Sequence, residues 1–525
     1  MATILNNYFQ KFDKLVLIIF VIINLYLYIF SIVKIENSHF YFSLFALLSI
    51  INIVKFFFYK SSIFEKFFSF YIWLGFFFFY CIHLLFFKHD YNFSIGNFDV
   101  GNATHQKELF IILIIVELAI LISSIISSKY IVIKHTYSQD KLWLNKYSNI
   151  LLFFLASSVL IISFLNINFK FFDYYYFSNA KFMPEIDLFL KWFFLFGFSS
   201  FLCLFLNLNW GKNFIIGVFV ISCFQEFLFF FSILSRGCIF NSLALLIALF
   251  IKNKEMKIMS NKNIGLFFML ISILFVTNFY ILIEQRGGSN IQNFKDFRGV
   301  SIKSGNNKII NKFENTVENV KKWDFIFASA NASDSKKISV KPMSINLIAK
   351  DINDDSLFFE RLSKDKLLRI FFSVKNRIFG IDSLMAIVAY DDKGFKLLKD
   401  SLEEKFSPGQ VSFFDKIRTK NTIVKSNPNN LTMPGIIGFL YYSGSLTFVF
   451  VSIMIIIFVF NLIEFINIKI NNNIFLTCLL SQLMAYRLWH FGYTPLNSYK
   501  YFISIFVSMF IVYCLQKYLV KYNKL

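Results

Sequence analysis

The sequence contains very little arginine and none of the common motifs of soluble enzymes. Arginine supplies eight of the 53 basic residues, and lysine supplies the rest. No Asp-x-Asp pair, P-loop, His-Glu-x-x-His or Gly-x-Ser-x-Gly motif occurs. These motifs hold metal-bound nucleotides, phosphates, zinc or a serine nucleophile. We therefore expect neither a metal ion nor a soluble cofactor.

Acidic residues are also scarce, and no cysteine lies outside the apolar segments. The 32 acidic residues leave a net charge of +21. The basic residues flank apolar segments instead of forming one soluble basic face, which argues against a nucleic-acid partner. All six cysteines fall within apolar segments. Neither a disulfide framework nor a metal cluster is predicted.

Long apolar segments dominate the chain. Hydrophobic residues make up 57% of it and charged residues only 16%, a composition typical of an integral membrane protein in the lipid bilayer. Stretches of about 17 to 22 apolar residues are long enough to span a bilayer as helices. The predicted fold is all-α, with about twelve such spans near 15–33, 40–59, 67–87, 109–128, 148–167, 188–206, 213–234, 238–251, 264–283, 436–461, 474–491 and 499–516.

Lysine predicts the orientation of these spans. Lys11 and Lys14 precede the first span, which is too long for a cleaved signal core and acts as a signal anchor. With a cytoplasmic N-terminus, 18 lysines lie in inner segments and seven in short outer loops. The positive-inside rule then places both termini in the cytoplasm. Three regions follow: nine helices in 1–283, a large extracytoplasmic loop in 284–434, and three helices in 435–525.

The large loop has helical patterning. Apolar residues recur at helical spacing in 309–323 and 358–371. After Gly380, the Asp382-Ser383 pair predicts the N-terminal cap of a third helix running through Val388. We expect a cap of amphipathic helices over the outer end of the membrane helices.

All eight arginines fall on the predicted outer side. They are Arg236, Arg286, Arg298, Arg361, Arg369, Arg377, Arg418 and Arg487. Arg236, Arg286 and Arg298 each precede a glycine, which lets backbone N–H groups approach an anion. The planar guanidinium forms paired hydrogen bonds with phosphate. The alternative is that some arginines, especially Arg361 and Arg418, reach lipid headgroups or pair with acids of the loop.

Other polar residues lie in or beside the spans. Glu117 and Glu226 fall within spans, where an unpaired charge is costly, so they are either functional or hydrogen-bonded while protonated. His490 follows Arg487 near the end of a span and is either interfacial or a candidate base. Trp489, Tyr441 and Tyr442 are typical of the aromatic belt at a membrane surface.

Three short motifs carry a family resemblance. They are Leu234-Ser235-Arg236-Gly237, Arg377-Ile378-Phe379-Gly380-Ile381-Asp382 and Pro434-Gly435-Ile436-Ile437-Gly438. Together with twelve spans and one long outer loop, they resemble the Wzy-type O-antigen or capsule repeat-unit polymerases, which are related to the O-antigen ligases. Ligases typically carry a histidine in the loop, and this loop has none. The departure favours a polymerase.

The resemblance implies a metal-independent C-type membrane glycosyltransferase in the bacterial inner membrane, with its large loop in the periplasm. Its partners would be an undecaprenyl-pyrophosphate-linked glycan donor and acceptor, and a chain-length regulator. By position Arg236 matches the family's short-loop arginine, and Arg286, Arg298 and Arg377 are candidates for those of the large loop. We expect catalytic roles for Arg236, Arg286, Arg377, Asp382 and Glu284. Substrate-binding roles go to Arg298, Arg369, Arg487 and His490. Asp382, Glu284 and then His490 are the candidates for the general base.

Two alternatives remain from the sequence. An O-antigen ligase would move the same donor onto a lipid A core. A flippase for lipid-linked oligosaccharides also has about twelve spans, but such proteins place charges in a central cavity and have short loops. The roughly 150-residue loop, 284–434, argues against the flippase.

Overall fold

Apolar runs of the sequence form long helices in a computed structural model of the chain. The model describes residues 2–35, 37–58, 61–87, 95–130, 147–169, 189, 192–208, 211–233, 239–256, 259–260, 263–274, 276–278, 380–404, 412–418, 433–492 and 495–522. Nearly all of them belong to one compact unit, which combines Met1–Val276 with Val374–Leu525. The second unit, Thr277–Ser373, lies outside the described residues apart from its first two.

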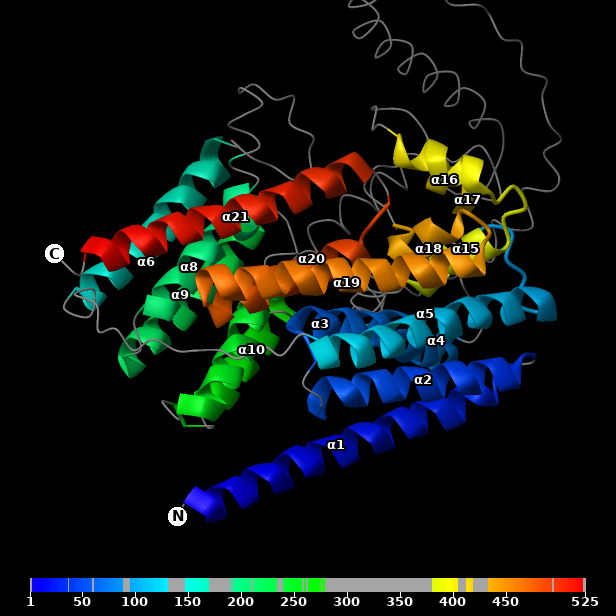
Figure 1. The fold of residues 1–525 in the computed structure, drawn as a ribbon, viewed down its shortest axis with the longest axis horizontal. Helices are drawn as coiled ribbons and strands as arrows, with labels where there is room; N and C mark the ends of the chain where they lie inside the picture. Colours follow the sequence, from blue (N-terminus) through cyan, green and yellow to red (C-terminus); the bar gives the residue numbers. More distant parts are fainter. Residues whose placement is uncertain are drawn as a thin grey trace, which may run out of the picture. The chain divides into compact units, whose positions relative to one another are not determined.

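The described residues form helices and no strand (Figure 1). The N-terminal helices are α1 (Ala2–Ile32), α2 (His39–Phe58), α3 (Ile63–Ile72), α4 (Phe79–Phe87), α5 (Ala103–Tyr130), α6 (Ser148–Phe169), α8 (Phe198–Leu208), α9 (Lys212–Ile233) and α10 (Ile239–Met256). The C-terminal helices are α15 (Ile381–Val388), α16 (Phe395–Leu402), α17 (Phe413–Arg418), α18 (Gly435–Tyr441), α19 (Leu446–Asn471), α20 (Ile474–Trp489) and α21 (Pro495–Tyr522). The all-α prediction is confirmed for these residues.

Among the described residues, six helices are long and apolar enough to cross a membrane. They are Ile63–Leu85, Ala103–Ser127, Ser148–Asn166, Lys212–Phe229, Leu446–Asn471 and Ser498–Leu519. Shorter apolar helices occupy the positions of the other predicted spans, including Leu17–Ile32 and Ile474–Trp489. The chain is therefore a helical protein with membrane character, and the full set of twelve spans stays a prediction.

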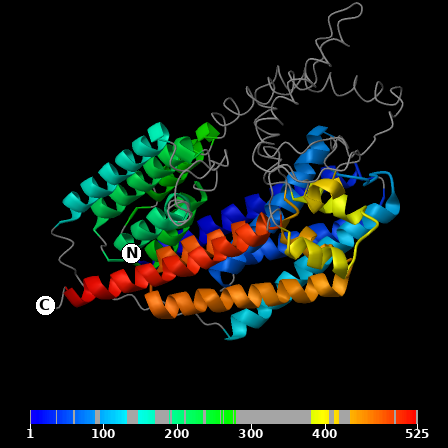
Figure 2. The same cartoon turned by 90° about the horizontal axis from the view of Figure 1, so that it is seen from above.

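Helices from distant parts of the sequence form the core. α20 packs against α3 and α10, and α5 packs against α2 and α19. In both ribbon views the orange α19 runs beside the cyan α5 (Figure 1, Figure 2). Fully buried aromatic residues such as Phe68 and Phe110 fill this core. Helices from the N-terminal and C-terminal parts of the chain therefore pack together in one bundle.

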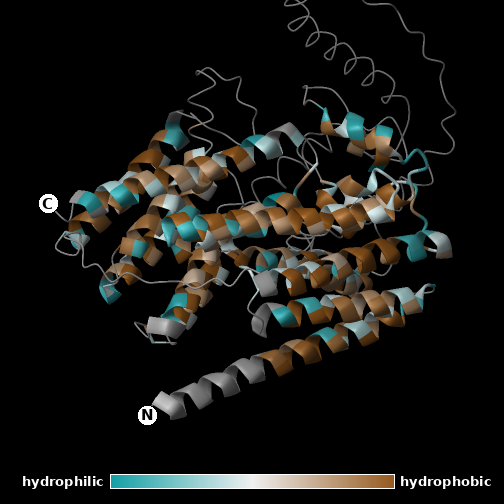
Figure 3. Cartoon of the chain, viewed as in Figure 1, coloured by the Kyte–Doolittle hydropathy of each residue, from teal (hydrophilic) through white to brown (hydrophobic). Residues whose placement is uncertain are grey.

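The outward faces of the long helices are apolar. Ile455 and Phe458 of α19 and Ile503 and Phe510 of α21 are each more than half exposed. Figure 3 shows hydrophobic residues along most of both helices. A face of this kind is stable in lipid and costly in water. Together with their length, it supports assigning these helices to a bilayer.

The predicted span 436–461 has the wrong bounds. The structure replaces it with two helices, α18 and α19, separated by Gly444 at φ +67°. Ser445 starts the second helix, because its side chain accepts a hydrogen bond from the backbone N–H of Phe448. Glycine tolerates the left-handed conformation, and serine is a favoured N-cap. The apolar run alone conceals this break.

In the described part of the chain, two π-helical segments interrupt apolar helices. η1 (Trp73–Phe78) joins α3 to α4, and η3 (Phe193–Gly197) leads into α8. Each π turn takes up an extra residue and displaces a backbone carbonyl from the regular pattern. Such turns occur often at functional sites.

Candidate functional site

The end of α20 carries the described part of the candidate site. There Trp489 lies against Gly380, just before α15, and a Cβ at Gly380 would come within 2.8 Å of the indole. A Cβ at Gly435 would come within 2.9 Å of the Trp489 carbonyl oxygen. Both glycines therefore let the chain pass directly over Trp489. We call this region the Trp489 end of the bundle.

Asp382 lies in this region, in the first turn of α15. The predicted helix is present, but Gly380 and not the Asp382-Ser383 pair occupies the N-cap position. No side chain makes the capping hydrogen bond. Asp382 is only 6% exposed. The helix dipole stabilises a carboxylate in the first turn of a helix, and this helps to accommodate the buried Asp382 side chain at the start of α15.

α15 also differs from the predicted amphipathic cap. All eight of its residues are buried, and it packs against α5 and α18. This part of the loop is therefore an internal element of the bundle, not a helix lying over it. The two amphipathic segments predicted in 309–323 and 358–371 lie outside the described residues.

Arg487 lies in the last turn of α20, and no carboxylate among the described residues forms an ion pair with it. Its guanidinium carbon lies 5.2 Å from the centre of the Tyr501 ring, which is a cation–π contact. Its Nε atom is buried and donates no hydrogen bond to the described residues. A buried Nε donor that finds no acceptor among the described residues is costly, so this group is suited to receive an anion.

His490 follows α20 directly as its C-cap residue. Its Nδ1 atom lies 3.2 Å from the Tyr486 carbonyl oxygen, and its ring contacts the Tyr486 ring at 4.3 Å between centroids. These contacts are those of a residue that stabilises a helix end. Its role as a base or substrate ligand stays a prediction.

The other predicted site residues lie outside the part of the chain that the structure describes. They are Arg236, Arg286, Arg298, Arg369, Arg377 and Glu284. The structure thus brings Asp382, Arg487 and His490 to the Trp489 end and leaves the remaining assignments as predictions. Among the residues described, no group of three or more His, Cys, Asp or Glu side chains could hold a metal ion.

A polar cluster that sequence reasoning missed lies at the start of α5. The Tyr441 hydroxyl donates a hydrogen bond to Glu108, and the Lys393 Nζ lies 3.3 Å from the same carboxylate. Lys393 also donates to the Val388 carbonyl at the end of α15. Burial and the Glu108 carboxylate both raise the pKa of Tyr441. Tyr441 is therefore a neutral donor that ties α18 to α5, not only an interfacial aromatic residue.

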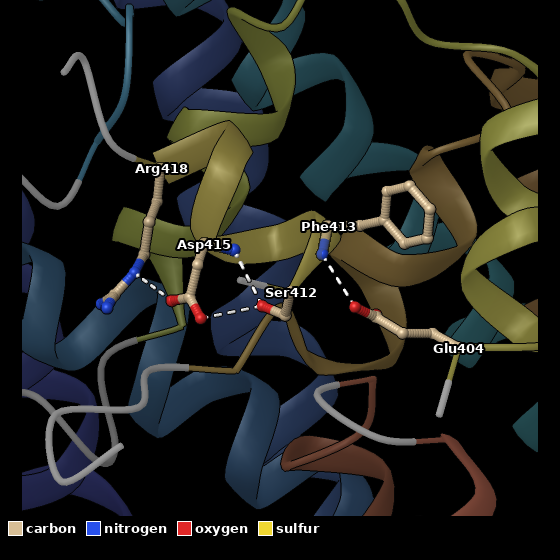
Figure 4. A network of polar contacts seen from close by, with 5 residues as sticks. All are labelled: Glu404, Ser412, Phe413, Asp415 and Arg418. Atoms are coloured by element: carbon tan, nitrogen blue, oxygen red, sulfur yellow. Dashed lines mark hydrogen bonds and ion pairs between the residues drawn. The ribbon is translucent and has the colours of Figure 1, made fainter. Parts of the chain in front are cut away.

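A second network holds α17 (Figure 4). The Arg418 Nε donates to Asp415 at 2.9 Å, and Ser412 donates to the same carboxylate at 2.9 Å. Glu404 accepts from the backbone N–H of Phe413 at 2.9 Å. Arg418 thus pairs with an acid of the loop, as the alternative reading of its sequence position predicts.

Buried acids also link the membrane helices. The Glu117 carboxyl accepts a hydrogen bond from Asn52, which is the contact that the hydrogen-bonded alternative requires. Glu65 accepts from Ser127 and Asn461, and Glu464 accepts from the first turn of α3 and from Ser481 at 3.0 Å. Sequence reasoning overlooked Glu65 and Glu464, because both lie at the edges of predicted spans. Apart from Ser481, their partners are supplied by helices far away in the sequence.

Comparison with known proteins gives no further assignment: no family model, curated protein or solved structure matches the chain significantly. The chemistry of the site is therefore inferred from the properties of its residues. An arginine that forms no ion pair with a described carboxylate, such as Arg487, can bind an anion, and a buried carboxylate such as Asp382 can accept a proton.

Proposed function

We propose that the chain is a metal-independent membrane glycosyltransferase that polymerises lipid-linked oligosaccharide repeat units, of the Wzy type. The observation that carries this proposal is the contrast between the two described arginines. Arg418 is paired with Asp415, whereas Arg487 faces no carboxylate among the described residues. An enzyme that handles a lipid pyrophosphate needs guanidinium groups left available for the phosphate.

The reaction would proceed by displacement at the sugar. The acceptor hydroxyl oxygen bonds to C1 of the donor glycan, and the bond from C1 to the pyrophosphate oxygen breaks. The acceptor proton passes to a carboxylate, for which Asp382 or Glu284 is proposed. Undecaprenyl pyrophosphate leaves with the bonding electron pair. Arginines at the site would stabilise that growing negative charge more in the transition state than in the ground state.

Placement of Asp382 and Arg487 at one end of the bundle supports this division of roles. Trp489, two residues after Arg487, contacts Gly380, two residues before Asp382. Membrane character supports a lipid-linked substrate. The bacterial inner membrane, cytoplasmic termini and a periplasmic loop belong to the same proposal.

Electrophoresis of surface glycans from a deletion strain tests the proposal. Complementation with the wild-type gene should restore a ladder of chain lengths. Arg236→Ala, Arg377→Ala and Arg487→Ala should each leave core plus one repeat. Arg418→Ala is the matched control and should keep the ladder, because its guanidinium is already engaged by Asp415.

Other outcomes would contradict the polymerase. A normal ladder in all three variants, at wild-type protein levels, would rule out the arginine site. Accumulation of finished lipid-linked polymer in the deletion strain would indicate a ligase. Transport of labelled lipid without chain growth in proteoliposomes would indicate a flippase.

A further inference from the structure

A second polar cluster lies inside the membrane helices, between α8, α9 and α10, which contact one another. Its residues come from the interiors of otherwise apolar helices and are at most 2% exposed. They are Ser199 on α8, Ser222, Gln225 and Glu226 on α9, and Asn241 and Ser242 on α10. We call this set the Glu226 cluster. It contains one acid, and no described lysine or arginine forms an ion pair with it.

The side-chain amide nitrogens of the cluster already donate hydrogen bonds. The Asn241 Nδ2 donates to the Leu195 carbonyl oxygen at 2.8 Å, and the Gln225 Nε2 donates to the Ser199 hydroxyl at 3.2 Å. Ser222 and Ser242 share a hydrogen bond of 2.7 Å. A carbonyl oxygen only accepts, so the Leu195 contact fixes which end of the Asn241 amide is nitrogen.

Most acceptors of the cluster, in contrast, are unused. The Oε1 of Gln225 and the Oδ1 of Asn241 are buried and accept no hydrogen bond from the described residues. Both carboxylate oxygens of Glu226 are buried too, and the Ser242 hydroxyl offers this carboxyl only a hydrogen bond of poor geometry. Buried polar groups are nearly always satisfied, and an unsatisfied buried acceptor destabilises the fold.

We infer that the Glu226 cluster binds a monovalent alkali cation, Na⁺ or K⁺. Carboxylate, amide and hydroxyl oxygens are the ligands preferred by hard cations. A single carboxylate neutralises one positive charge, so a monovalent ion leaves no net charge in the apolar interior, whereas a divalent ion would leave one. A proton on Glu226 would supply one hydrogen bond only. A cation satisfies several acceptors at once.

The π-helical segment η3 gives independent support. Leu195, whose carbonyl accepts from Asn241, lies within η3, immediately before α8. The π turn breaks the regular carbonyl pattern at this level of the helix and allows that carbonyl to point sideways toward α10. Backbone irregularity at membrane depth is tolerated where it lines a polar site.

Binding of radioactive sodium to the purified full-length protein in detergent tests this inference. The wild type should bind Na⁺ saturably, with one ion per chain, when choline maintains the ionic strength. Unlabelled K⁺ should compete if the site accepts both ions. Glu226→Gln should abolish binding, and Asn241→Ala should weaken it by about tenfold or more.

Glu117→Gln is the matched control, because it neutralises another buried acid whose carboxylate is already hydrogen-bonded to Asn52. It should bind Na⁺ like the wild type. Gel filtration checks that each variant is folded. If Glu226→Gln does not fold, Asn241→Ala still tests the site, because it retains the Glu226 carboxylate. Absence of saturable Na⁺ and K⁺ binding in the wild type would overturn the inference. Equal binding by wild type and both cluster variants would overturn it as well.

Discussion

The Glu464 carboxylate of α19 lies 2.6 Å from the backbone nitrogen of Phe64, in the first turn of α3. It also accepts from the N–H of Ile63 at 2.8 Å, while Ser62 accepts from the N–H of Glu65. The first N–H groups of a helix have no partner within the helix. Here a side chain from the other end of the sequence satisfies two of them inside an apolar bundle.

Removal of the Glu464 carboxylate should therefore destabilise the bundle. We expect Glu464→Ala to lower the free energy of unfolding by about 3 kcal/mol, because two buried N–H groups lose a charged acceptor. Glu464→Gln keeps one acceptor oxygen and should lose less. Thermal unfolding in detergent measures both variants. The exposed Glu403→Ala should match the wild type, and an equal melting temperature for Glu464→Ala would contradict the capping role.

Substitution of Gly380 should disturb the Trp489 end. An added Cβ would lie 2.8 Å from the Trp489 ring and 3.0 Å from Phe76, so both rings must move. We expect Gly380→Ala to cost about 1–3 kcal/mol of stability. Gly265→Ala is the control, since nothing lies within 4 Å of its added Cβ. A stabilised Gly380→Ala would show that the two segments are not in contact.

The Tyr441 hydroxyl and Glu108 should be energetically coupled. Tyr441→Phe and Glu108→Gln each remove or weaken one hydrogen bond between α18 and α5. A double-mutant cycle should give a coupling energy of about 1 kcal/mol. The same cycle between Tyr441→Phe and Glu403→Gln should be additive. Additivity in the first cycle would mean that the two side chains do not interact.

Glu404 predicts a pH dependence of stability. Burial raises the pKa of its carboxyl, while the hydrogen bond from Phe413 opposes that shift. The folded state thus favours the protonated form, and this contribution is present at low pH and lost as pH rises through the raised pKa. Glu404→Gln keeps an acceptor for Phe413 without the charge. It should melt above the wild type near neutral pH and match it in acid; the reverse order would refute the assignment.

The sequence predicts the positions of the helices better than it predicts which helices pack against each other. Apolar length predicts where membrane helices lie, and Gly380 followed by Asp382 marks the start of α15 within two residues. Burial of all of α15 is not predictable, because its contacts come from α5 and α18. Periodicity reports which residues are apolar and not which helix covers them.

The polar pairs show the same division. Arg418 and Asp415 are three residues apart on one helix, and their ion pair follows from helical spacing. Glu108 and Tyr441 are 333 residues apart, and nothing in either local sequence indicates the other. Long-range pairs depend on how the helices pack, which a single sequence leaves open.

The contact between Gly380 and Trp489 sets an order for biogenesis. The ribosome synthesises α3 and η1 long before it synthesises α20. Nevertheless, Phe76 of η1 and Gly380 both lie against Trp489 of α20 in the folded protein. The early helices are therefore synthesised while this face is still uncovered. Closure of that face waits until α20 has been synthesised.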